Sequence, residues 1–127
     1  MIPIADRDDI AYGVLDATDV DDMADLLGET FSAGEPMAVA AGFRREDLAA
    51  MVRVFGRAAV AQQVTIVARA RNGDLAGALL TDDFGVPPPD GLQAFTQFGP
   101  VAAVLEVSRR VTAKDAPSPR ANACISQ

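Results

Sequence analysis

The sequence has no histidine and no tryptophan, and its 127 residues include one cysteine, Cys124, and one tyrosine, Tyr12. Without histidine there can be no serine–histidine or cysteine–histidine catalytic pair. A single cysteine cannot form a disulfide framework within the chain. Zinc sites built from histidine and cysteine are excluded by the same shortages, and nothing else in the sequence indicates a metal.

Long apolar runs and a basic N-terminal segment are also missing. No stretch approaches the roughly 20 apolar residues that cross a bilayer. Residues 1–9 carry three aspartates and one arginine, unlike a secretory signal peptide. A lone cysteine suits a reducing compartment, so the sequence predicts a cytoplasmic protein with no membrane partner.

Basic residues are scarce. Eleven lysines and arginines stand against 18 acidic residues, giving a formal net charge of −7. Nucleic acid is therefore not expected as a partner, because phosphates require a basic surface. The acids are concentrated in residues 1–35, which contain ten acids and only Arg7 as a base. An acidic surface favours a cationic small molecule such as an amine, although a solvated helix face would explain the same pattern.

The remaining composition indicates a single globular domain. Half of the residues are hydrophobic, and the chain is long enough to bury a core without disulfides or metals. We expect this domain to cover residues 1–107. Residues 108–127 are polar and interrupted by Pro117 and Pro119, and we expect them to form a disordered tail.

Hydrophobic spacing predicts the elements of the domain. Residues 10–16 alternate loosely, as in a strand. From Thr18, which heads a variant capping box, steps of three and four predict a helix whose buried stripe is Val20, Met23, Ala24, Leu27 and Phe31. Similar spacing predicts a second helix from about Arg45 to Gln63, with Leu48, Met51, Val52, Phe55 and Ala59 on its buried side.

A hairpin follows, with strands Thr65–Arg69 and Leu75–Leu80. Its turn contains Asn72-Gly73, the dipeptide preferred by a type I′ turn because both central residues need positive φ. A last helix is predicted to start at Pro100. The expected fold class is α+β, a small antiparallel sheet of about three strands with helices packed against it.

Glu35 stands between two helix-breaking residues. Gly34 can end the first helix, and Pro36 should prevent it from resuming at once. Glu35 is then either a solvated loop acid or a carboxylate beside a binding cleft. Asp82 and Asp83, just past the third strand, leave a similar choice between acids that end a strand and acids that attract a cation to a cleft mouth.

The order strand, helix, helix, strand, tight hairpin, strand, helix resembles the N-terminal half of the GNAT superfamily of N-acetyltransferases. The arylalkylamine and dopamine acetyltransferase-like members are the most similar. The resemblance covers roughly residues 10–107 and rests on residues 12–18, on Phe31 followed by Glu35-Pro36, and on residues 67–77 and 98–105. It implies acyl transfer from acetyl-CoA to an amine, with Glu35 as general base, since an ammonium must lose its proton before attacking a thioester.

The sequence departs from the family at the cofactor-binding motif. That motif resembles Gln/Arg-x-x-Gly-x-Gly/Ala at a helix start, where backbone amides hold the pyrophosphate. Only Arg53-Val-Phe-Gly56-Arg-Ala58 fits that spacing, and it lies inside the second predicted helix, so we interpret it as a chance match. No such motif follows Leu105. No cofactor is therefore expected for this chain, although the family uses acetyl-CoA.

The expected function is that of a GNAT-family protein that lacks the CoA-binding half and is inactive as an isolated chain. Two alternatives stay open. One is a small-ligand-binding or protein-interaction module that reuses the half-fold, and the other is an acyltransferase completed by oligomerisation. The strand Leu75–Thr81 should expose an unpaired edge, which predicts a homo-oligomer formed through this edge or through the apolar last helix.

Overall fold

The computed structural model describes residues 1–83, 85–87, 89–91, 95, 98, 99, 103, 107, 110 and 111. The chain divides into two units, Met1–Gln97 and Phe98–Gln127. In the second unit Ala103, Val107, Arg110 and Val111 are helical. The rest of the predicted last helix and of the predicted tail lies outside the described residues.

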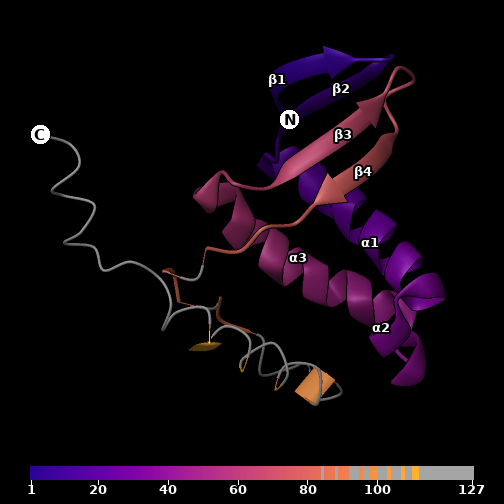
Figure 1. Cartoon of the computed structure of the whole chain (residues 1–127), viewed down its shortest axis with the longest axis vertical. Helices are drawn as coiled ribbons and strands as arrows, with labels where there is room; N and C mark the ends of the chain where they lie inside the picture. Colours follow the sequence, from indigo (N-terminus) through magenta and orange to yellow (C-terminus); the bar gives the residue numbers. More distant parts are fainter. Residues whose placement is uncertain are drawn as a thin grey trace, which may run out of the picture. The chain divides into compact units, whose positions relative to one another are not determined.

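The first unit has the predicted α+β class, but its sheet has four strands rather than three (Figure 1). The strands are β1 (Ile2–Arg7), β2 (Ile10–Val14), β3 (Ile66–Ala70) and β4 (Leu75–Leu79), antiparallel and in that order. The sequence analysis missed β1, whose six residues are all exposed and include Pro3. A strand without a buried face gives no apolar alternation, which was the signal used to find strands.

The two hairpins have different turns, and the turn at Asn72-Gly73 is not the one expected. Asp8 and Asp9, between β1 and β2, have φ of 54° and 64°, the pattern of a type I′ turn. In the β3–β4 hairpin only Gly73 has positive φ, at 92°. Gly73 N–H donates to the Ala70 carbonyl at 2.9 Å, and Ala70 N–H donates to the Asp74 carbonyl at 2.9 Å. The loop is therefore three residues long, and the type I′ prediction for Asn72-Gly73 was wrong.

A local side-chain contact explains the longer loop. Asp74 N–H donates to Asn72 Oδ1 at 3.0 Å, which is the contact of an Asx-turn. The side chain of Asn72 accepts a hydrogen bond that a backbone carbonyl would otherwise accept, so Asn72 does not need the left-handed conformation. Gly73 is then the one residue of the loop in that conformation.

Three α-helices and one 3₁₀ turn connect β2 to β3. They are the turn η1 (Ala17–Asp19) and the helices α1 (Val20–Gly34), α2 (Pro36–Ala40) and α3 (Arg45–Gln62). The predicted cap at Thr18 was wrong. Asp16 is the N-cap, with Thr18 N–H donating to Asp16 Oδ1 at 2.8 Å and Asp16 N–H donating to Asp19 Oδ2 at 3.1 Å. A carboxylate two residues earlier thus starts the helical segment at Ala17.

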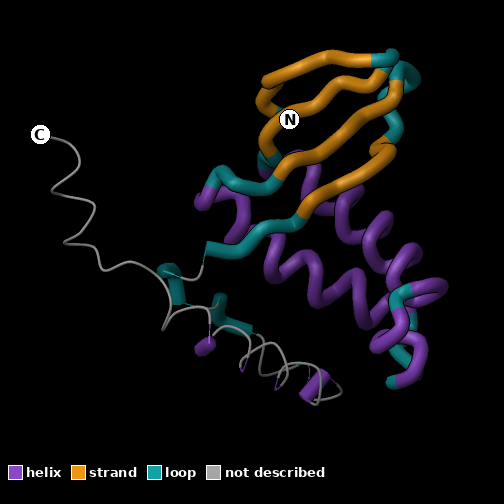
Figure 2. The backbone as a smooth tube through the Cα atoms, in the orientation of Figure 1, coloured by secondary structure: helices purple, strands orange, loops and turns teal. Residues whose placement is uncertain are grey.

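The core lies between α1, α3 and the face of the sheet that they cover (Figure 2). Its buried members are Leu15, Val20, Met23, Ala24, Leu27, Ala49, Val52, Ala59 and Val67. The predicted stripe of α1 is correct except at Phe31, which is 41% exposed. On α3, Leu48, Val52 and Ala59 are buried as predicted, whereas Met51 and Phe55 are only half-buried.

Candidate functional site

Glu35 links two helices. Helix α1 ends at Gly34 as expected, but α2 begins at Pro36, so the prediction that Pro36 would prevent a helix from resuming at once was wrong. Proline stops the first helix but suits the first position of the second, where its missing N–H would have no intrahelical partner. Glu35 Oε2 accepts a hydrogen bond from Ala38 N–H at 2.6 Å. The half-buried carboxylate is therefore the N-cap of α2.

Asp83 forms a turn after β4. Its Oδ1 accepts from Gly85 N–H at 2.8 Å, and its carbonyl accepts from Val86 N–H at 3.0 Å. Its own N–H donates to Gln62 Oε1 at 2.9 Å. These contacts attach the chain leaving the sheet to the end of α3. Asp82 is exposed.

The structure does not join these three acids into one cluster. Glu35 lies at the corner between α1 and α2, which Figure 1 shows at the end of α1 away from the sheet. Asp82 and Asp83 instead follow β4 where the chain leaves the sheet. In the part of the chain that is described, no hydrogen bond or ion pair connects Glu35 to a residue near them.

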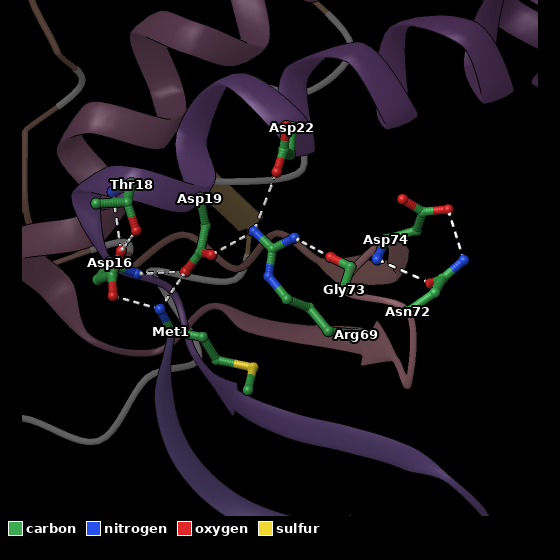
Figure 3. A network of polar contacts seen from close by, with 9 residues as sticks. All are labelled: Met1, Asp16, Thr18, Asp19, Asp22, Arg69, Asn72, Gly73 and Asp74. Carbon is green, nitrogen blue, oxygen red and sulfur yellow. Dashed lines mark hydrogen bonds and ion pairs between the residues drawn. The ribbon is translucent and has the colours of Figure 1, made fainter.

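The most extensive polar network among the described residues was missed by the sequence analysis. It centres on Arg69 of β3 (Figure 3). Arg69 Nη2 donates to Asp19 Oδ1 at 2.6 Å and to Asp22 Oδ2 at 3.1 Å, and Nη1 donates to the Gly73 carbonyl at 2.8 Å. One guanidinium thus connects β3, the hairpin loop and the start of α1.

Asp19 is the buried member of this network, with a side chain only 2% exposed. Its Oδ2 accepts from Asp16 N–H at 3.1 Å and lies 2.8 Å from the Met1 amino group. Burial acts to raise the pKa of Asp19, but hydrogen bonds from the Met1 amine and from Arg69 outweigh it, so the pKa lies below its usual range. The hydrogen bond from the same amine, together with those from Thr18, also lowers the pKa of Asp16.

The network of Arg69 and its acidic partners satisfies its own hydrogen bonds and charges. Arg69 lies on the side of β3 that faces the helices, next in alternation to the fully buried Val67. A charged residue in such a position requires a buried partner of opposite charge. An arginine in the core-facing alternation of a strand was therefore the signal by which the sequence could have revealed this network. Among the described residues, no buried side-chain nitrogen or oxygen lacks a hydrogen-bond partner. We therefore interpret the Arg69–Asp19 contact as structural.

Shallow hollows lie on the described surface of the first unit. One, of about 340 Å³, is lined by Asp22, Asp25, Gly73, Asp74 and Leu75. Another, of about 390 Å³, is lined by Ala17, Val20, Asp21, Arg57 and Val60. Neither is lined by Glu35, Asp82 or Asp83. The described residues contain no group of three or more histidine, cysteine or acidic side chains arranged to hold a metal ion.

No helix within the described ranges is long and apolar enough to cross a membrane. No protein-family model, curated protein or solved structure matches the chain.

Proposed function

We propose that this chain is a GNAT-like N-acetyltransferase family protein that lacks the acetyl-CoA-binding half, and that it binds an amine acceptor but does not bind acetyl-CoA usefully by itself. The observation that supports the proposal most is the connectivity of the fold. The family order of strand, two helices and a strand hairpin is matched by β2, α1, α3, β3 and β4. The sheet is antiparallel, and β3 and β4 form a tight hairpin.

Glu35 supplies the acceptor-side carboxylate in this proposal. One of its oxygens caps α2 through Ala38 N–H. A carboxylate offers about four lone-pair sites, so capping leaves it able to accept a hydrogen bond from an ammonium group. The amine substrate would then be oriented by Glu35 before it loses its proton.

Two features support the proposal that the chain does not bind acetyl-CoA by itself. They are the lack of a glycine-rich loop after Gly99 and the position of the one motif match inside a helix. After Gly99 the sequence contains no glycine, so it has no further glycine-rich loop. The one match to the pyrophosphate motif, residues 53–58, lies within α3. Amides in the middle of a helix already donate to carbonyls four residues earlier and cannot converge on a phosphate. A net charge of −7 also disfavours an anionic cofactor.

Calorimetry with acetyl-CoA at physiological salt tests the cofactor side. We expect no saturable binding, and desulfo-CoA serves as the control for weak attraction of phosphate to the basic residues 109–120. A one-to-one complex with a dissociation constant below about 10 μM, equivalent to roughly −7 kcal/mol, would contradict the proposal. If such binding emerged only at high protein concentration, an acyltransferase completed by oligomerisation would be the better description.

An NMR titration with 2-phenylethylamine tests the acceptor side. We expect shifts around Glu35 and Ala38, and weaker binding in Glu35→Gln. This substitution removes the charge but keeps an oxygen that can cap Ala38 N–H, so α2 should persist. Glu46→Gln is the matched control, because it makes the same change at an exposed position of α3. Shifts confined to the acidic face of α1, with Glu35→Gln binding like the wild type, would argue against an acceptor site at Glu35.

A protein-interaction module is the second candidate function. It is favoured by a specific observation, the exposed apolar side chains on the sheet, among them Ile2, Tyr12 and Leu79. An apolar surface of this kind marks interaction sites in soluble proteins. If the chain bound no amine but did associate with itself, this candidate would be favoured.

A further inference from the structure

The two faces of the sheet can be assigned from strand register, because directly paired residues share a face. Gly13, Val67 and Ala78 are aligned across β2, β3 and β4, and Val67 is fully buried against the helices. Tyr12, Ala68 and Gly77 are aligned one residue along and therefore lie on the opposite, outer face. The outer face is not the one that packs on α1 and α3.

The outer face is apolar across all four strands. Its larger apolar members are Ile2, Ile10, Tyr12, Val14, Ile66 and Leu79. Ile2 is 46% exposed, Tyr12 37% and Leu79 66%. Among the positions that the register places on this face, only Arg7 is charged, and it lies at the end of the edge strand β1. An antiparallel sheet with one solvated face normally places polar residues there, so this face has the composition of a covered surface.

The edges of the sheet are less suited to a partner. Strand β1 carries Pro3, a register shift between Pro3 and Ala5, and the charged residues Asp6 and Arg7. Strand β4 has a register shift opposite Ala68 and Arg69. Proline, charge and bulges all hinder the addition of another strand. Apart from Arg7 at the end of β1, the outer face carries no comparable obstacle. We therefore expect self-association through this face and not through an edge.

We infer that the outer face of the sheet binds the same face of a second copy of this chain. A two-fold interface must be self-complementary, and a face that is apolar apart from Arg7 at its edge meets that condition without matching charge to charge. The acids of α1 lie on the other side of the sheet, in the layer of helices. Sheets pack about 10 Å apart, so the helical layers of two copies would be separated by more than the Debye length of about 8 Å. Two chains of charge −7 can then approach without bringing the carboxylates of α1 together.

The size of the face sets the expected strength. Four strands about 4.8 Å apart and five residues long, at about 3.4 Å per residue, span roughly 20 by 17 Å. The pair would cover roughly 700 Å² in projection, which is below the roughly 1,200 Å² of standard specific interfaces and in the range of weak, transient ones. We therefore expect a reversible dimer that is populated at tens to hundreds of micromolar.

Sedimentation velocity between about 5 and 500 μM tests the inference on the full chain. Tyr12 lies on β2, an interior strand, so Tyr12→Lys places a charge on the face without touching either edge. Phe31→Lys is the matched control, because Phe31 is 41% exposed on α1. We expect a dimer for the wild type, at least a tenfold higher dissociation constant for Tyr12→Lys, and less than a twofold change for Phe31→Lys. Leu79→Lys should repeat the effect of Tyr12→Lys, and circular dichroism would verify folding of each variant.

Salt provides an independent measurement. Because association is apolar and opposed by net charge, raising the salt from about 0.05 M to 0.5 M should lower the dissociation constant by screening repulsion. A chain that stays monomeric at 500 μM would overturn the inference and leave the face to a different occupant. A dimer that survives Tyr12→Lys and Leu79→Lys, or that dissociates as salt rises, would overturn it in favour of an edge or a charge-paired contact.

Discussion

The guanidinium of Arg69 donates to the buried carboxylate of Asp19 at 2.6 Å, across 50 residues of sequence. Arg69 belongs to β3, and Asp19 ends the 3₁₀ turn that precedes α1. This single pair therefore fastens the central part of the sheet to the start of the helical layer. The first prediction follows from the burial of Asp19.

Arg69→Ala should destabilise the protein by about 3 kcal/mol, because removing one partner of a buried pair leaves the other charge uncompensated. The remaining contact of Asp19 with the Met1 amine keeps this estimate at the low end of the usual range. Urea unfolding monitored by circular dichroism measures the change.

Arg53→Ala is the control for this prediction. Arg53 also bridges two acids, Asp21 at 3.1 Å and Asp25 at 3.2 Å, but both carboxylates are more than half exposed. Exposed pairs contribute about 0–1 kcal/mol. If the two alanine variants lost equal stability, the Arg69–Asp19 pair would not have the structural role assigned to it.

Stability should fall on acidification. The pKa of Asp19 is lowered in the folded state, so its contribution to the free energy of unfolding is complete above the unfolded value of about 3.9 and is lost as the pH falls through the folded value. Asp19→Asn removes this titration and should flatten the dependence of unfolding free energy on pH between about 2 and 5. An unchanged slope in Asp19→Asn would mean that other carboxyl groups carry the acid sensitivity.

Gly28→Ala should destabilise the contact between α1 and α3. A Cβ at Gly28 would lie 2.9 Å from the Arg45 carbonyl oxygen and 3.1 Å from Ala49 Cβ. The backbone atom cannot move aside cheaply, so we expect a loss of about 1–3 kcal/mol. Gly34→Ala, at the end of the same helix, meets no atom within 4 Å and should be neutral or stabilising by up to about 1 kcal/mol. Thermal unfolding of both variants checks the contrast.

Asp9→Gly should stabilise the β1–β2 hairpin. Asp8 and Asp9 both have positive φ, and Asp-Gly is among the preferred type I′ dipeptides. We expect a gain of about 0.5–1 kcal/mol from relief of the left-handed strain at Asp9. The variant also loses the exposed ion pair between Asp9 and Arg71, so Arg71→Ala measures that loss separately. A hairpin less stable than in Arg71→Ala would contradict the turn assignment.

Local sequence predicted most elements of the fold. Apolar spacing located α1, α3, β2 and the β3–β4 hairpin, and α3 ends one residue from the expected boundary. These predictions succeeded because each element has one face in the core, and burial imposes the period of the element on its sequence. Strand β1, which has no buried face, left no such period.

The candidate site shows the limit of local reasoning. Glu35 was recognised as unusual from its neighbours Gly34 and Pro36, but its hydrogen bond to Ala38 depended on the helix resuming at once. The side chain of Asn72 likewise changed the type of turn that Asn72-Gly73 forms. In both cases several short-range hydrogen bonds compete for the same backbone groups. The preference of one dipeptide does not tell which of these hydrogen bonds will form.

The sequence by itself determined the α+β class and the helical stripes, because these follow from the spacing of apolar residues along the chain. It also determined the excess of acids and the absence of histidine-based chemistry. Only the tertiary structure decided that Arg69 meets Asp19 and that Tyr12 shares one face with Ile66 and Leu79. Such relationships depend on strand register and on how helices cover a sheet. Both are set by packing between segments that are distant in sequence, on which local spacing carries no information.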